Sequence, residues 1–252
     1  MTYSGFLLCF VVLPIVILVI AIRRNIHKPF WPAVLAHMIL AVVYTTPWDN
    51  YLVATQVWSY NPHLVTGILF GYVPIEEYLF FVLETLLAGL WWRFLSERFS
   101  ESKNFTPANA MRWIAFFTVL VIWIFFAFLL FKGGRHFTYL SITLFWALPV
   151  LLPQMLFGAD ILWHHRRLVS LGVLVPAVYL SAADIVALRA TTWSISAAQA
   201  TGILFFGILP VEEIAFFLVT TSLVVFGVTL LLSGEGRRRF SDWKSKINEG
   251  IS

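Results

Sequence analysis

Seven long stretches of apolar residues divide this chain of 252 residues, and they constrain its fold more than any other feature. Each stretch is long enough to cross about 30 Å of hydrocarbon as a helix. Only 12% of the residues are charged, too few to give a soluble protein its polar surface. The sequence therefore predicts an all-α polytopic membrane protein with seven transmembrane helices. The predicted spans are Gly5–Ile22, Phe30–Thr46, Thr66–Trp92, Trp113–Phe131, Phe137–Gly158, Leu168–Ala183 and Thr201–Leu232.

The basic residues indicate how these spans are oriented. Fourteen of the 17 Lys and Arg residues lie at span ends that share one side of the membrane, and three lie on the other side. The positive-inside rule then predicts a multi-pass protein of the cell membrane, with its N-terminus outside and its C-terminus in the cytoplasm. Because the charges are spread over short loops, the net charge of +4 indicates orientation and not a nucleic-acid partner. The first segment lacks a preceding basic residue and a following cleavage site, so we expect it to remain as a span.

The sequence repeats itself. Tyr44, Asp49 and Trp58 recur 135 residues later as Tyr179, Asp184 and Trp193. After one inserted residue, Gly71, Pro74, Glu76, Glu77, Phe80 and Phe81 recur 136 residues later as Gly207, Pro210, Glu212, Glu213, Phe216 and Phe217. A three-span unit followed by one linking span gives both copies the same orientation, so we expect two parallel repeats. The predicted domains are residues 1–95, a linker of 96–136 with the fourth helix, 137–232, and a basic cytoplasmic tail of 233–252.

Acidic residues inside apolar segments are the main candidates for function. Seven of the 13 acids lie there: Asp49, Glu76, Glu77, Glu84, Asp184, Glu212 and Glu213. Placing an acid in the membrane costs a few kcal/mol, so such residues are usually functional. Alternatively, Glu76 and Glu212 cap helix entries, where an acid suits the positive end of a helix. The alternative for Asp49 and Asp184 is an acid in a turn at the interface, and Glu84 ranks lower because Thr220 replaces it in the second copy.

Apolar surroundings and a like-charged neighbour both favour the protonated form of a carboxyl, which is then a Brønsted acid at neutral pH. Phe80, Phe81, Phe216 and Phe217 are expected beside these acids, where ring faces stabilise a cation. Adjacent glutamates on a helix point about 100° apart, so one member of each pair can face a cavity while the other supports it.

Other chemistries lack a signal. The chain has one cysteine, no phosphate-binding glycine loop and no lysine inside a span, so we expect no metal, no bound nucleotide cofactor and no retinal Schiff base. His164 and His165 stand beside Arg166 and Arg167 and are interpreted as orientation signals, since adjacent histidines alone make a poor metal site.

Three motifs resemble the membrane lycopene cyclases, the heterodimeric bacterial type and its fused archaeal and fungal relatives. They are Thr46–Tyr51, with Trp48 and Asp49; Pro74–Glu77; and Pro210–Glu213. The resemblance covers roughly residues 3–232, and this chain looks like the fused form. The second copy departs from the first at Ala183-Asp184-Ile185, so the two halves need not be catalytically equal.

The resemblance implies a lycopene β-cyclase that closes the acyclic ends of lycopene without net redox change and without a cofactor. It implies Glu76 and Glu212 as the acid or its partner, Glu77 and Glu213 in support, and Asp49 and Asp184 as base or positioning groups. Trp48 and the four phenylalanines would contact the substrate. The expected partners are lycopene and membrane lipid, and the oligomeric state stays open. A proton-coupled transporter and a non-catalytic carotenoid-binding protein are the alternatives.

Overall fold

The computed structural model describes residues 1–22, 29–99 and 104–251. Within these ranges, seven helical spans are long and apolar enough to cross a membrane, which confirms the predicted class of protein. The first span joins α1 (Tyr3–Phe6), a π-helical segment (Leu7–Val12) and α2 (Leu13–Ala21). The others are α3 (Phe30–Ala54), α4 (Ile75–Ser96), α5 (Asn109–Lys132), α6 (Thr138–His164, after a 3-10 turn at Arg135–Phe137), α7 (Arg166–Arg189) and α8 (Val211–Leu232).

The third and seventh apolar segments are not helical from their beginnings. Each starts with a β-hairpin, formed by β2 (Leu69–Phe70) with β3 (Val73–Pro74), and by β5 (Leu204–Phe205) with β6 (Leu209–Pro210). The helix then begins at the next residue, because a proline disfavours the helical conformation in the residue before it. Gly71 and Gly207 turn the hairpins with φ of 69°, a conformation that favours glycine. The inserted residue of the second copy, Phe206, lies in its hairpin.

The second and sixth spans run further than the sequence suggested. The helix of α3 continues through Pro47 to Ala54, and α7 continues to Arg189. Asp49 and Asp184 therefore lie inside helices and are buried, so the alternative of an acid in an interfacial turn was wrong. Proline is tolerated inside membrane helices where neighbouring groups satisfy the freed carbonyl. The tail after Leu232 is also helical, as α9 (Gly234–Ile251).

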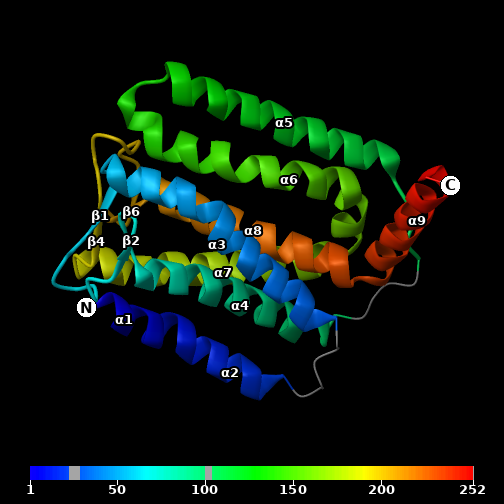
Figure 1. Cartoon of the computed structure of the whole chain (residues 1–252), viewed down its shortest axis with the longest axis horizontal. Coiled ribbons are helices and arrows are strands. Elements are labelled where there is room, and N and C mark those ends of the chain that lie inside the picture. Colours follow the sequence, from blue (N-terminus) through cyan, green and yellow to red (C-terminus); the bar gives the residue numbers. More distant parts are fainter. Residues whose placement is uncertain (23–28, 100–103, 252) are drawn as a thin grey trace.

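Figure 1 shows both hairpins, the N-terminus and the remaining strands at one end of the bundle. There β1 (Trp58–Tyr60) pairs antiparallel with β4 (Trp193–Ile195), which joins the loop after α3 to the loop after α7. Ser59 lies opposite Ser194 in this register, and their Oγ atoms are 3.0 Å apart. The strand pair thus closes one end of the bundle between the two halves of the chain.

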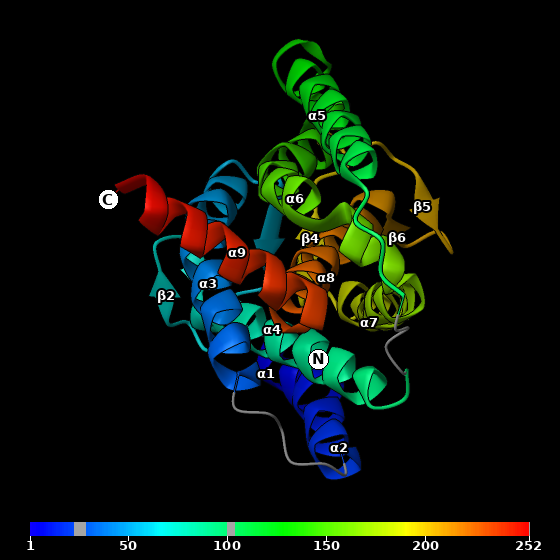
Figure 2. The same cartoon turned by 90° about the vertical axis from the view of Figure 1, so that its right-hand side faces the viewer.

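The packing around α8 and α4 forms the core. Down the bundle, α2 and α5 lie at opposite edges, with α3, α4, α7 and α8 between them (Figure 2). None of the described residues of α5 is buried, whereas α4 and α8 each bury more than half of their membrane-spanning residues. Small residues bring these helices close: Gly89 of α4 faces Val34 of α3, and Gly172 of α7 faces Val225 of α8.

Candidate active site

Two buried tyrosine–glutamate pairs lie at the strand end of the bundle. The hydroxyl of Tyr3, in α1, donates to Oε2 of Glu77 in the first turn of α4. The hydroxyl of Tyr139, in α6, donates to Oε1 of Glu213 in the first turn of α8, at 2.6 Å. The members of each pair are 74 residues apart in sequence. The two halves of the chain therefore build the same arrangement.

The search for acids in the sequence missed both tyrosines. A signal for them exists, because Tyr139 follows Tyr3 at the 136-residue offset that relates Glu213 to Glu77. Backbone contacts repeat as well: the amide of Tyr3 donates to the carbonyl of Leu64 at 2.8 Å, and that of Tyr139 donates to Gln199 at 2.9 Å. These bonds fix each tyrosine against the loop that precedes its hairpin.

Two tryptophans from the strand pair cover the tyrosines across the halves. The Trp58 ring lies edge-on to Tyr139 at 5.6 Å, and the Trp193 ring lies against Tyr3 at 5.0 Å. Each loop thus contacts the tyrosine of the other half. This crossed packing makes the site depend on both halves of the chain.

The aspartates of α3 and α7 are both buried but are not equally paired. Trp193 donates its indole N–H to Oδ1 of Asp184 at 2.8 Å. Among the described residues, neither carboxylate oxygen of Asp49 has a hydrogen-bond partner. Burial, followed by the nearby carboxyls of Asp49 and Glu77, raises the pKa of Tyr60 at the end of β1.

A cavity of about 40 Å³ lies between these groups. Three carboxylic acids line it: Glu77, Asp184 and Glu213. All its other lining residues are aromatic, and their polar groups are phenols and indoles. The aromatic lining residues are Tyr3, Phe6, Trp58, Tyr60, Phe80, Trp193, Phe216 and Phe217. A buried space of this kind combines proton donors with ring faces that attract positive charge.

Glu76 and Glu212 are placed differently from their neighbours. Glu76 accepts hydrogen bonds from the backbone N–H of Thr66 at 2.6 Å and from its hydroxyl at 3.0 Å. Glu212 accepts from the backbone N–H of Thr201 at 2.6 Å. Both glutamates are buried, but neither lines the cavity. They attach the loop before each hairpin to the first turn of the following helix.

The predicted aromatic residues come together around the cavity. Phe80 and Phe217 meet edge-on between the halves at 6.4 Å. Phe216 stacks on Trp48 at 5.8 Å with only 4° between the ring planes. Phe81 is buried beside Phe80, with its ring centroid 6.5 Å away. Phe80, Phe216 and Phe217 thus line the cavity with the carboxyl groups, and Trp48 and Phe81 contact these rings from outside it.

One feature of the first half has no equivalent in the second. Asn50 donates to Tyr78 at 3.0 Å and accepts from the amide of Tyr72 at 2.8 Å, which ties the first hairpin to α3. Its Oδ1 lies where a side chain on Gly71 would project. The repeat places Ile185 at the position of Asn50 and Ile214 at that of Tyr78, so the second hairpin packs without this network.

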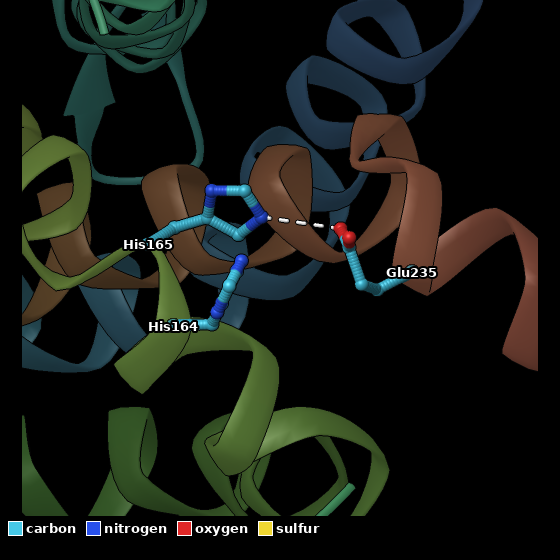
Figure 3. A group of neighbouring side chains, drawn as sticks. All are labelled: His164, His165 and Glu235. Carbon is cyan, nitrogen blue, oxygen red and sulfur yellow. Dashed lines mark hydrogen bonds and ion pairs between the residues drawn. The ribbon is translucent and has the colours of Figure 1, made fainter. Parts of the chain in front are cut away.

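In the described part of the chain, one group of three potential metal ligands comes together, at the opposite end of the bundle from the glutamate pairs. It consists of His164, His165 and Glu235, and Figure 3 shows the His165–Glu235 contact of 3.3 Å. Burial alone would raise the pKa of Glu235, but hydrogen bonds from its own backbone and from His165 hold that pKa below its ordinary value. Arg238 lies 3.6 Å from the same carboxylate. Because His165 and Arg238 already contact this carboxylate, we assign no metal to the group.

Comparison with known proteins identifies the family. A family model described as lycopene cyclase matches residues 1–95. A lycopene beta-cyclase of Halobacterium salinarum is 41% identical over 191 residues, which cover 76% of this chain and 78% of that protein. The chain belongs to the lycopene cyclase family. This confirms the resemblance seen in the sequence motifs.

Fungal members of the lycopene cyclase family match as well. Bifunctional lycopene cyclase/phytoene synthases of Gibberella fujikuroi and Podospora anserina are 32% and 34% identical to this chain. The matches cover 75% and 77% of this chain, but only 33% and 34% of the fungal proteins. No solved structure matches the chain.

Proposed function

We propose that this chain is a lycopene β-cyclase, an isomerase that closes the acyclic ends of lycopene to β-rings. The observation that carries the proposal is the aromatic cavity in which Glu77, Asp184 and Glu213 meet. The names of the relatives point to the same substrate, since the Halobacterium salinarum protein is a lycopene beta-cyclase. The substrate is a hydrocarbon, so it reaches such a cavity from the lipid.

The reaction needs one proton added and one removed for each ring. Protonation at C2 of the end group creates a cation at C1, and the C5=C6 double bond attacks that cation to close the ring. Loss of the proton from C6 then gives the β-ring, so atoms and charge balance without a redox partner. An acid, a base and a low-polarity site that stabilises a cation are sufficient for this chemistry.

We assign the proton donor to Glu77 or Glu213, because these glutamates line the cavity while Glu76 and Glu212 bond the preceding loops. Tyr3 and Tyr139 hold the two carboxyls in place through their hydroxyls. Asp184 is the candidate base in the cavity wall, and Asp49 is its counterpart in the first half. Phe80, Phe216 and Phe217 line the cavity in which the cation would form, and aromatic rings stabilise positive charge.

The site in this proposal is shared by two parallel three-helix repeats. Three observations support it: the matching Tyr–Glu pairs, the crossed contacts of Trp58 and Trp193, and contacts between equivalent residues. Ser59 meets Ser194, its own equivalent, at the strand end. Such contacts are expected along a pseudo-twofold axis parallel to the membrane normal.

We also propose that the N-terminus lies outside and the C-terminus in the cytoplasm, which puts the carboxyl cavity toward the outer face. The charge asymmetry supports this orientation. Four of the basic residues behind it, Arg23, Arg24, Lys28 and Lys103, lie outside the residues that the structure describes.

Expression of the full chain in cells that accumulate lycopene tests the proposal. Pigment extracted from these cells should contain γ- or β-carotene, and cells carrying an empty vector should contain lycopene alone. Lycopene that stays acyclic but copurifies with the protein would favour a carotenoid-binding protein. Lycopene that neither reacts nor binds would favour the transporter.

A further inference from the structure

A second and larger cavity adjoins the carboxyl cavity. It has a volume of about 180 Å³ and lies between α3, α4, α6 and α8. Phe216 lines both spaces. Along α3 the lining runs from His37 to Thr45, a rise of roughly 12 Å of helix at 1.5 Å per residue. We call this second space the α3–α6 groove.

Stacked aromatic rings connect the carboxyl cavity with the outside of the groove. Phe216 stacks on Trp48 at 5.8 Å, Trp48 on Trp146 at 4.5 Å, and Trp146 on Tyr44 at 5.6 Å. The angle between neighbouring ring planes is 25° or less at each step. Tyr44 at the outer end is 40% exposed, so the column runs from the candidate site to the lipid-facing surface.

The outer end of the column is bonded in both directions. The Tyr44 hydroxyl donates to the carbonyl of Trp146 at 2.8 Å, and the Trp146 indole donates to the carbonyl of Tyr44 at 3.3 Å. These bonds pair the hydroxyl of Tyr44 and the indole N–H of Trp146, so neither ring presents an unpaired polar donor to the groove. They also hold α3 and α6 at a fixed separation beside the groove.

The polar side chains of the groove are largely turned back to the protein. Thr85 donates to the carbonyl of Phe81 at 2.8 Å, and Gln154 donates to that of Leu223 at 3.0 Å. His37 Nδ1 lies 2.7 Å from the carbonyl of Ala33, and Glu84 accepts a bond from Thr220 at 2.7 Å. The groove therefore suits a ligand without hydrogen-bonding groups.

From this geometry we infer that the α3–α6 groove binds the conjugated hydrocarbon chain of the substrate while its end group occupies the carboxyl cavity. The inference rests on the proposed function. A flat conjugated chain packs well against the aromatic and aliphatic side chains that line the groove. Leu40, at 62% exposed, marks the side that opens to lipid. Because the groove is short, most of a long carotenoid stays in the lipid. One end of the substrate is thus bound at a time, and the second end needs a second binding event.

Filling the groove tests the inference. In a full-length Glu77→Gln/Glu213→Gln background, the protein is purified from lycopene-producing cells, and retained carotenoid per protein is measured by absorbance and induced circular dichroism. Ala41→Trp and Leu223→Trp add bulk from α3 and α8, and each should lower retention by about tenfold or more. Val43→Trp and Leu231→Trp add the same ring to exposed positions of the same helices and should leave retention within about twofold.

Two readouts keep the inference separable from the proposed function. If Ala41→Trp impairs folding, judged by size-exclusion chromatography, Ala41→Leu and Leu223→Trp provide smaller or independent obstructions. Full retention in folded groove variants would overturn the inference even if the parent chain makes β-rings. If retention depends on the groove but the unmodified chain makes no rings, the groove inference would stand and the cyclase proposal would be overturned.

Discussion

Glu84 accepts a hydrogen bond of 2.7 Å from Thr220, the residue that takes its place in the second half of the chain. Equivalent residues of two repeats can contact each other only near the axis that relates them. Glu84 therefore lies where the proposed halves meet, and it lines the α3–α6 groove instead of the carboxyl cavity.

Replacing Glu84 with glutamine should have a small effect. The amide oxygen still accepts the bond from Thr220, and no step of the proposed reaction uses this side chain. We expect cyclisation per protein to stay within about threefold of the unmodified chain, measured by pigment analysis of membranes with matched protein content. A loss as large as that caused by Glu77→Gln would make Glu84 part of the catalytic machinery.

The two adjacent glutamates in each half of the chain should respond differently to substitution by glutamine. Glu77→Gln or Glu213→Gln removes a carboxylic acid from the cavity, and at least one of these variants should lose cyclisation by about 10²-fold or more. Glu76→Gln and Glu212→Gln keep an oxygen that accepts from Thr66 or Thr201, so they should retain more activity. Initial rates in membranes, normalised to folded protein, provide the comparison. The reverse order would restore the assignment of Glu76 and Glu212 that the motifs suggested.

Much of the site could be predicted from the sequence because membrane burial is costly for an acid. This argument singled out seven acids, and all seven are buried: Asp49, Glu76, Glu77, Glu84, Asp184, Glu212 and Glu213. It could not decide between Glu76 and Glu77, because adjacent side chains on a helix differ only in the direction in which they point. The hydrogen bond from the Thr66 amide, ten residues away, determines which glutamate turns to the loop.

The fold shows a similar division between what local sequence specifies and what packing adds. Long apolar runs predicted seven spans, and the structure contains them. The same hydropathy could not distinguish Leu69–Pro74, which forms a hairpin, from the helix that starts at Ile75. Nor could it predict that Trp58 covers Tyr139, since that contact joins segments 81 residues apart through pairing of β1 with β4.

Removing the tyrosine hydroxyls should reduce catalysis without unfolding the protein. In Tyr3→Phe and Tyr139→Phe the ring still packs against Trp193 or Trp58, but Glu77 or Glu213 loses its donor. We expect the variant whose tyrosine bonds the proton-donating glutamate to lose activity by about tenfold, equal to about 1.4 kcal/mol. Initial rates and thermal unfolding of both variants separate this from a structural defect. Unchanged rates in both would show that the tyrosines do not position the acid.

Reporter fusions test the proposed orientation. A reporter joined after residue 60 or after residue 195 should read outside. These positions are the ends of β1 and β4, and the proposed orientation puts that end of the bundle outside. A reporter joined after residue 100 should read inside, as the positive-inside rule requires. The inverse pattern would move the carboxyl cavity to the cytoplasmic half of the membrane.

The source of the added proton gives the most direct test of the chemistry. If Glu77 or Glu213 starts the reaction, the proton delivered to C2 comes from solvent, because the carboxyl exchanges with water between turnovers. The proton lost afterwards leaves from C6, a different carbon. Each ring formed in D₂O should therefore carry one deuterium, located at C2.

Purified protein in lipid vesicles with unlabelled lycopene is sufficient, with mass spectrometry to count deuterium and NMR to locate it. A parallel reaction in H₂O, transferred to D₂O only after quenching, controls for exchange into the finished ring. Rings without deuterium at C2 would rule out a solvent-exchanging glutamate as the acid, even if β-carotene is the product. A reduced flavin or nicotinamide needed only for assembly or redox poise would leave the label at C2, because the carbon that accepts the proton is the same.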